Sequence, residues 1–164
     1  MQNQTKTIAI LAAMAMAILP ALSSARAADD GAATGETKMT SLERVKTTEK
    51  GKLKNPLTLT PEIIAEGKDL YQAKTCGACH GGNGSGIHCP SLINDAWVYG
   101  SDDDTIFRLV TLGSDELLRG GASRGDKEQI AGPMPGFGAT IPDELELWKI
   151  IAYIRSLQPG AAAN

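Results

Sequence analysis

Three stretches of the chain carry apolar residues at the spacing of an amphipathic helix, and no stretch alternates convincingly like a strand. In the first, residues 60–74, Thr60 can cap the helix and Pro61 occupies its first turn. The second, residues 103–112, begins with aspartates that suit the positive end of the helix dipole. The third covers residues 142–157, and its apolar stripe consists of Leu145, Trp148, Ile151, Ala152 and Leu157. We therefore expect an all-α fold.

The N-terminus has the pattern of an export signal. Lys6 is followed by an apolar run over residues 8–22 and then by Ala25-Arg26-Ala27, small residues at the places a signal peptidase requires. The run is shorter than the ~20 residues that cross a bilayer. We expect residues 1–27 to be a signal peptide cleaved after about Ala27. The location is then the periplasm, and the mature chain has no membrane span.

The region between this signal and the first helix is small, polar and charged. Residues 28–59 contain few large apolar side chains and no sustained period, so we expect a flexible arm with one short helical stretch near residues 41–46. The folded domain is expected over residues 60–158, followed by a tail, residues 159–164.

The charge of the chain excludes some partners. The sequence has 16 basic and 19 acidic residues, and the signal holds two of the basic ones and none of the acidic, so the mature chain carries a formal charge of −5. An acidic surface argues against nucleic acids and anionic lipids, which bind basic patches. It suits a protein partner with a positive face, although the acidity could equally serve only to keep the protein dispersed.

The clearest chemical motif is Cys76-Gly77-Ala78-Cys79-His80, the attachment pattern of c-type haem. Thiols separated by two residues can add to the two vinyl groups of one porphyrin, and the adjacent His80 then lies where its imidazole binds iron. A thioredoxin-like dithiol would need an α/β sheet, which the pattern does not predict. A zinc site would need His88 or Cys89 crowded into the same loop. Haem is therefore the expected cofactor.

Met134 is the candidate for the sixth ligand of the iron. It stands in Gly-Pro-Met-Pro-Gly, where prolines restrict the backbone and glycines would let the loop approach the porphyrin. A neutral, soft thioether favours Fe(II) and raises the reduction potential. His88 is too close to His80 to reach the opposite face of the ring, and Met39 lies in the predicted arm. Met134 could otherwise fill a gap in the core.

With these residues identified, residues 60–158 resemble a class I c-type cytochrome. The resemblance implies that the first and last helices cross closely, with Gly67 facing Tyr153. It also implies that the carbonyl of Pro90 accepts a hydrogen bond from the His80 imidazole and holds its tautomer.

A narrower resemblance concerns residues 79–110 together with the Gly-Pro-Met loop. These are similar to the c-L-like cytochromes that accept electrons from pyrroloquinoline-quinone methanol or alcohol dehydrogenases, which share the stretch matched here by Leu92-Ile93-Asn94-Asp95-Ala96-Trp97. The chain lacks the long C-terminal tail of some of them, and residues 113–132 have no clear counterpart. The resemblance implies a role in methanol utilisation.

Several residues keep two interpretations. Cys89 could be a small buried side chain or could pair two chains. The run Asp102–Asp104 could be a docking patch or the solvated start of a helix. Trp97 and Tyr99 could donate to a haem propionate, a buried anion that needs partners, or could only pack on the porphyrin edge. The candidates for the propionates are Trp97, Tyr99, Arg108, Arg119 and Arg124.

These observations favour a carrier of single electrons between a donor dehydrogenase and an acceptor cytochrome or oxidase, with no catalytic residue of its own. Two alternatives remain open. The chain could be the haem subunit of a permanent oxidoreductase complex, or a catalytic or gas-binding haem domain from which Met134 can dissociate.

Overall fold

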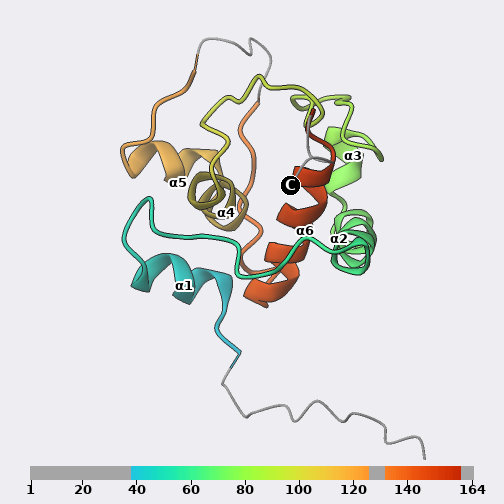
Figure 1. The fold of residues 1–164 in the computed structure, drawn as a ribbon. Coiled ribbons are helices and arrows are strands. Elements are labelled where there is room, and N and C mark those ends of the chain that lie inside the picture. The colour runs from blue at the N-terminus through green and yellow to red at the C-terminus, as the bar shows by residue number, and fades with distance from the viewer. Residues whose placement is uncertain (1–37, 126–131, 160–164) are drawn as a thin grey trace, which may run out of the picture. The chain divides into compact units, whose positions relative to one another are not determined.

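The computed structural model describes residues 38–125 and 132–159. The predicted signal peptide, the first part of the predicted arm and residues 160–164 of the predicted tail lie outside the described residues. The described parts belong to one compact unit of the chain, and they contain helices and two isolated β-bridges (Figure 1). In chain order the helices are α1 (Ser41–Thr47), α2 (Pro61–Ala73), α3 (Cys76–His80), α4 (Asp103–Leu112), α5 (Ser114–Arg119) and α6 (Glu144–Ser156).

The all-α prediction is confirmed, and the three long helices begin where their capping residues stand. The Thr60 side chain accepts from the amide of Ile63 at the start of α2. Asp102 caps α4 through the amide of Thr105, and Asp143 caps α6. In each case a side-chain oxygen accepts a hydrogen bond from an amide of the first turn that has no partner within the helix. Such capping residues can be recognised in the local sequence, which is why these boundaries could be predicted.

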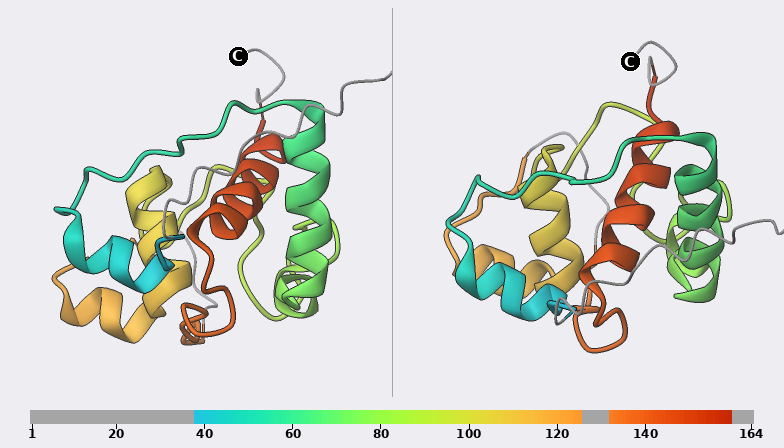
Figure 2. Two further views of the ribbon diagram at one scale, coloured as in Figure 1. Left: turned by 90° about the horizontal axis from the view of Figure 1, so that it is seen from below. Right: turned by 60° about the horizontal axis from the view of Figure 1, so that its bottom comes forward.

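Helices α2 and α6 cross in close contact (Figure 2). A Cβ atom on Gly67 would collide with the carbonyl oxygen of Lys149 and would lie 3.1 Å from the Cβ of Tyr153. The rings of Tyr71 and Tyr153 meet edge to face, with centroids 5.2 Å apart. The crossing expected of Gly67 and Tyr153 is therefore present.

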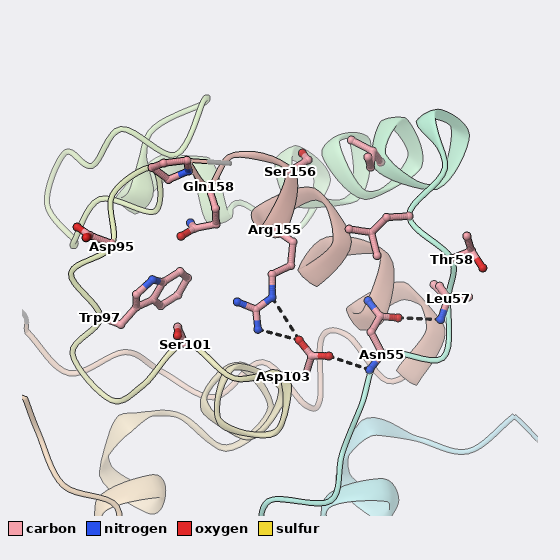
Figure 3. Close-up of a pocket in the computed structure, with 13 residues that line it drawn as sticks. Asn55, Leu57, Thr58, Asp95, Trp97, Ser101, Asp103, Arg155, Ser156 and Gln158 are labelled. Carbon is pink, nitrogen blue, oxygen red and sulfur yellow. Dashed lines mark hydrogen bonds and ion pairs between the residues drawn. The ribbon is translucent and has the colours of Figure 1, made fainter. Parts of the chain in front are cut away.

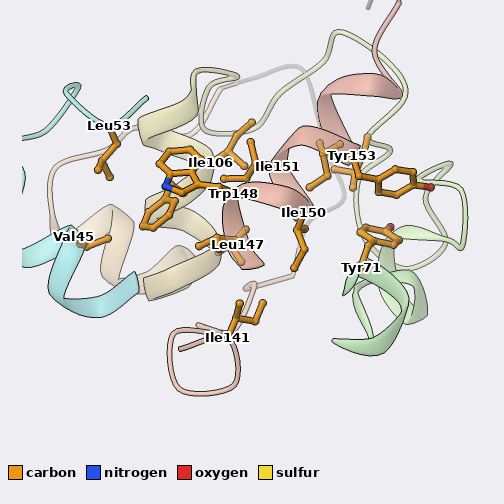
Figure 4. Close-up of a cluster of buried hydrophobic side chains, with 14 residues drawn as sticks. Val45, Leu53, Tyr71, Ile106, Ile141, Leu147, Trp148, Ile150, Ile151 and Tyr153 are labelled. Carbon is orange, nitrogen blue, oxygen red and sulfur yellow. The ribbon is translucent and has the colours of Figure 1, made fainter. Parts of the chain in front are cut away.

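The core surrounds α6 (Figure 4). Trp148 packs on Phe107 of α4 with ring centroids 4.4 Å apart, and Tyr71 contributes from the other side. The predicted stripe was wrong at Leu145, which is 39% exposed. Because α2 and α4 contact α6 on different sides, the buried face is wider than one stripe. It also includes Leu147, Ile150 and Ile154.

The arm prediction was wrong for residues 38–59, which pack against the domain. Val45 and Leu53 are buried in the core, and α1 covers one side of α4. The predicted helical stretch near residues 41–46 is confirmed as α1, which a Thr40–Glu43 capping box begins. The domain therefore starts before residue 60.

A buried ion pair holds this N-terminal segment in place. Arg108 Nε lies 2.7 Å from Asp104 Oδ2, and the guanidinium also donates to the carbonyl oxygens of Val45, Thr48 and Glu49. Asp104 in turn accepts from the amide of Leu53 at 3.0 Å. Most of the hydrogen bonds that hold this segment are made by its backbone groups. The pattern of hydrophobic residues in the segment therefore does not predict them.

Among the described residues, no helix combines the length and the apolar character needed to cross a membrane.

Candidate haem attachment site and axial ligands

The Cys76–His80 segment forms its own short helix directly after α2. Thr75 adopts a left-handed conformation with φ 62°, so the chain turns between α2 and α3. Cys76 and Cys79 are separated by one helical turn and therefore share a face. Both thiols are free, Cys76 being partly buried and Cys79 exposed. The two sulfurs are thus available to one planar group lying against α3.

The His80 ring is oriented by the loop that follows it. Its Nδ1 lies 2.9 Å from the carbonyl oxygen of Pro90, the contact that the class I resemblance implies. With Nδ1–H donating to that carbonyl, the lone pair of Nε2 is left to bind a metal.

The loop after His80 folds back over α3. The amides of Ile87, His88 and Cys89 converge on the carbonyl oxygen of Cys79 at 3.1–3.2 Å. The buried Tyr71 hydroxyl donates to the carbonyl oxygen of Gly81 at 2.8 Å. Burial raises the pKa of Tyr71 well above its ordinary value, and the nearby thiols raise it further to a smaller extent. The hydroxyl therefore stays protonated and ties this loop to α2.

Cys89 is not the fully buried side chain of the first interpretation, and pairing between two chains stays a prediction. It is only partly buried, and its thiol lies near the thiol of Cys79. Burial, together with that nearby thiol, raises the pKa of Cys89. This third cysteine therefore lies beside the attachment motif, a proximity that the sequence spacing does not reveal.

Met134 is partly buried and packs against the same core cluster as Cys76. Its loop is attached to the end of α4 and the start of α5, where Phe137 donates to the carbonyl oxygen of Val110 at 2.8 Å. The glycines were expected to bring the loop close to the porphyrin. A Cβ on Gly136 would lie 2.7 Å from the carbonyl oxygen of Leu112, so this glycine permits contact with the α4 backbone. The approach of the loop to the porphyrin stays a prediction.

The donor set suits haem better than the two alternatives. Two unpaired thiols share one face, an imidazole presents Nε2, and a thioether lies on the same core cluster, which matches the chemistry of covalent attachment and axial ligation. The described residues form no sheet on which a thioredoxin-like dithiol would sit. Nor do three His, Cys, Asp or Glu residues within 38–125 and 132–159 gather as ligands of a single metal ion.

The arginines proposed for the propionates are mostly engaged elsewhere. Arg108 is buried against Asp104, and Arg119 pairs with Glu116 on the surface. Arg124 precedes Gly125, whose amide donates to the carbonyl oxygen of Val98 at 2.5 Å. Arg124 is thus on a segment that runs beside Trp97, and its role toward a propionate stays a prediction.

Trp97 is partly buried and points into a cavity of about 770 Å³ that is also lined by Ser101 and Arg155 (Figure 3). Arg155 binds Asp103 there, with its Nη2 2.7 Å from Oδ1. This long-range ion pair had no local signal.

The three carboxylates of the Asp102–Asp104 run, which lie at the start of α4, have partners. Asp102 caps α4, Asp103 binds Arg155, and Asp104 is buried against Arg108. The run therefore begins a helix as expected, but Asp104 is buried rather than solvated, and a docking role for the run stays a prediction.

Comparison with known proteins agrees with this site. Residues 64–158 match the sequence profile of the family described as cytochrome c. The chain is 29% identical over 102 residues to the cbb3-type cytochrome c oxidase subunit CcoP of Helicobacter pylori (strain 52), a match over 62% of this chain and 30% of that protein. It is 29% identical over 132 residues to subunit FixP of Azorhizobium caulinodans, over 75% of this chain and 42% of that one.

The chain therefore spans less than half the length of these relatives. The profile, in contrast, covers more than half of the chain, from α2 to the end of α6. The protein thus belongs to the cytochrome c family, which transfers electrons through a covalently bound haem c.

Proposed function

We propose that this protein is a periplasmic monohaem cytochrome that carries single electrons between larger redox proteins. The observation that carries the proposal is the His80–Pro90 hydrogen bond, because it prepares Nε2 for iron directly beside two free thiols. When bound, the haem supplies a one-electron Fe(III)/Fe(II) couple. Export by residues 1–27 would bring the chain to the compartment in which this function is expected.

Four side chains have defined roles in this proposal. Cys76 and Cys79 would hold the porphyrin as thioethers, and His80 and Met134 would bind its iron. The thioether of Met134 favours Fe(II) and so raises the reduction potential above that of a bis-imidazole site. No proton transfer or nucleophile is needed, since each residue only binds, orients or excludes water.

Electrons would enter and leave beside Cys79. This is the exposed member of the cysteine pair, so the porphyrin edge it holds would lie nearest to solvent. Residues 75–94 contain no Asp, Glu, Lys or Arg, and Ile87 is 64% exposed there. We call residues 75–94 the uncharged surface. A partner would dock on it mainly by apolar contact, an arrangement suited to small and short-lived redox complexes.

The similarity to CcoP and FixP supports an acceptor of the haem–copper oxidase class. The Leu92–Trp97 stretch supports a quinone-dependent alcohol dehydrogenase as the donor. We propose this donor on sequence resemblance alone, and methanol utilisation depends on it.

A mixing experiment with the purified holoprotein tests these assignments. We expect a methanol dehydrogenase with its substrate to reduce the oxidised protein, and a cbb3-type oxidase to reoxidise it. Failure of the dehydrogenase arm alone would remove the donor. Failure of both arms would remove both partners, and tight binding of carbon monoxide to the reduced protein would replace the carrier with a gas-binding haem domain.

A second candidate, a permanent haem subunit of an oxidase complex, is favoured by the same relatives. It predicts that the cytochrome stays bound in a fixed ratio when the oxidase of its own organism is purified in high salt. A carrier would be lost in that step.

A further inference from the structure

Ser114 makes two hydrogen bonds to the backbone of Met134. The Met134 amide donates to Ser114 Oγ at 3.0 Å, and the Ser114 amide donates to the Met134 carbonyl oxygen at 2.9 Å. Ser114 is only 1% exposed. One buried residue thus holds both backbone polar groups of the candidate ligand.

The flanking prolines make this contact decisive for the loop. Neither Pro133 nor Pro135 has an amide hydrogen, so the Met134 amide is the only donor that the Pro-Met-Pro segment possesses. Its acceptor is the Ser114 hydroxyl. Without that hydroxyl, the amide would be left without a partner, which costs more than the bond itself contributes.

The start of α5 explains why Ser114 can donate as well as accept. Gly113 has φ +85°, and α5 begins directly after it. The first amides of a helix have no partner within the helix, so the Ser114 amide is free to bind the Met134 carbonyl. A Cβ on Gly113 would lie 2.8 Å from that carbonyl oxygen, so only glycine allows the two segments this close.

We propose that Ser114 is a positioning residue that keeps the Met134 thioether at the sixth site of the iron. It acts through the backbone of the ligand, so its loss would let the loop swing and make the ligand labile. The inference rests on the proposed function, in that it requires Met134 to be the ligand.

The test compares Ser114→Ala with Ser41→Ala in the full holoprotein. Ser41 is also fully buried, and its hydroxyl donates at 3.0 Å to the carbonyl oxygen of Ile141, seven residues beyond Met134. Both variants lose one buried hydrogen bond, so both should lower the melting temperature. Only Ser114→Ala should weaken the far-red sulfur-to-iron charge-transfer band and speed carbon monoxide binding, by roughly tenfold. Ser114→Thr, which keeps the hydroxyl, should restore the band.

Equal behaviour of the two alanine variants would overturn the proposal while leaving Met134 as the ligand. Met134→Ala tests separately whether Met134 is the ligand. If the band survives this change, the axial assignment itself is wrong. If Ser114→Ala yields no holoprotein, hydrogen exchange in the wild type decides. A slowly exchanging Met134 amide supports the contact with Ser114, and an amide that exchanges at the rate of an open loop overturns it.

Discussion

The amide of Ile87 donates to the carbonyl oxygen of Cys79 at 3.1 Å, so the backbone of an isoleucine that is 64% exposed meets the backbone of the exposed cysteine of the attachment motif. We therefore expect an apolar side chain near the edge of the porphyrin, within the uncharged surface. This relationship, rather than the Asp102–Asp104 run, defines where we expect a partner to dock.

Ile87→Glu should therefore slow electron transfer. A buried, unpaired carboxylate at a docking surface is costly, so we expect about a tenfold loss in the rate of electron self-exchange between two copies of the protein. Line broadening in nuclear magnetic resonance spectra of mixed oxidised and reduced samples measures that rate. Leu118→Glu, on α5 and 39% exposed, adds the same charge away from the uncharged surface and is the control. Equal rates in the two variants would argue against docking at Ile87.

Covalent attachment should distinguish Cys79 from its neighbour Cys89. In Cys79→Ala we expect haem held by one thioether at most, and poor folding, because a domain of this size gains much of its apolar core from the porphyrin. Cys89→Ala should keep both thioethers, although its thiol lies near that of Cys79. Mass spectrometry under denaturing conditions counts the attached haem. Loss of haem from Cys89→Ala, or native helix content in haem-free protein, would contradict this account.

Met134→Ala should abolish the far-red charge-transfer band of the oxidised protein and lower the reduction potential, because a thioether ligand stabilises Fe(II). Absorption spectra and a potentiometric titration measure the two effects. Met39→Ala is the matched control, since the carbonyl oxygen with which Met39 accepts from the amide of Glu144 is kept by alanine. A low potential already present in the wild type would point to a different sixth ligand.

Gly67→Ala should destabilise the crossing of α2 and α6. The new methyl group would collide with the carbonyl oxygen of Lys149, and overpacking of this kind costs about 1–3 kcal/mol. Denaturant unfolding of the holoprotein measures the loss. Gly132→Ala adds the same methyl group with nothing within 4 Å and should be nearly neutral. If the two variants are equally stable, the helices separate more easily than their packing indicates.

Asp104→Asn should break the buried pair with Arg108 and cost about 3–5 kcal/mol, because it leaves a buried guanidinium without its counter-charge. Asp69→Asn, at an exposed site of α2, should change stability little. Burial opposes ionisation of Asp104, yet the hydrogen bond from Arg108 and the amides of Gly51 and Leu53 outweigh it and lower its pKa. Unfolding experiments would measure both substitutions.

The lowered pKa of Asp104 also sets a direction for acid denaturation. A carboxylate whose pKa is lower in the folded state stabilises the protein above its unfolded value, ~3.9, and this contribution is lost as the pH falls through the folded pKa. The wild type should therefore lose stability in that acidic range. Asp104→Asn should lose less stability there, and equal slopes for the two proteins would contradict the assignment.

The attachment chemistry and the long helices followed from local sequence. Cys76, Cys79 and His80 act through a spacing of a few residues that any fold must respect, and Thr60 and Asp102 cap the helices that they precede. Gly67 and Tyr153 were placed by resemblance to the class I cytochromes, and the structure brings them together.

Only the tertiary structure decided the long-range polar contacts. Arg108 holds the backbone of residues 45–49, Arg155 binds Asp103, and Ser114 holds Met134 from 20 residues away. The contacts of Arg108 and Ser114 join a side chain to a backbone group, whereas Arg155 and Asp103 are two charged side chains from distant parts of the chain. Neither kind of contact leaves a period or a spacing in the sequence. Hydrophobic periodicity records which face of an element is buried, whereas the partner of a buried hydrogen bond is set by how those elements pack.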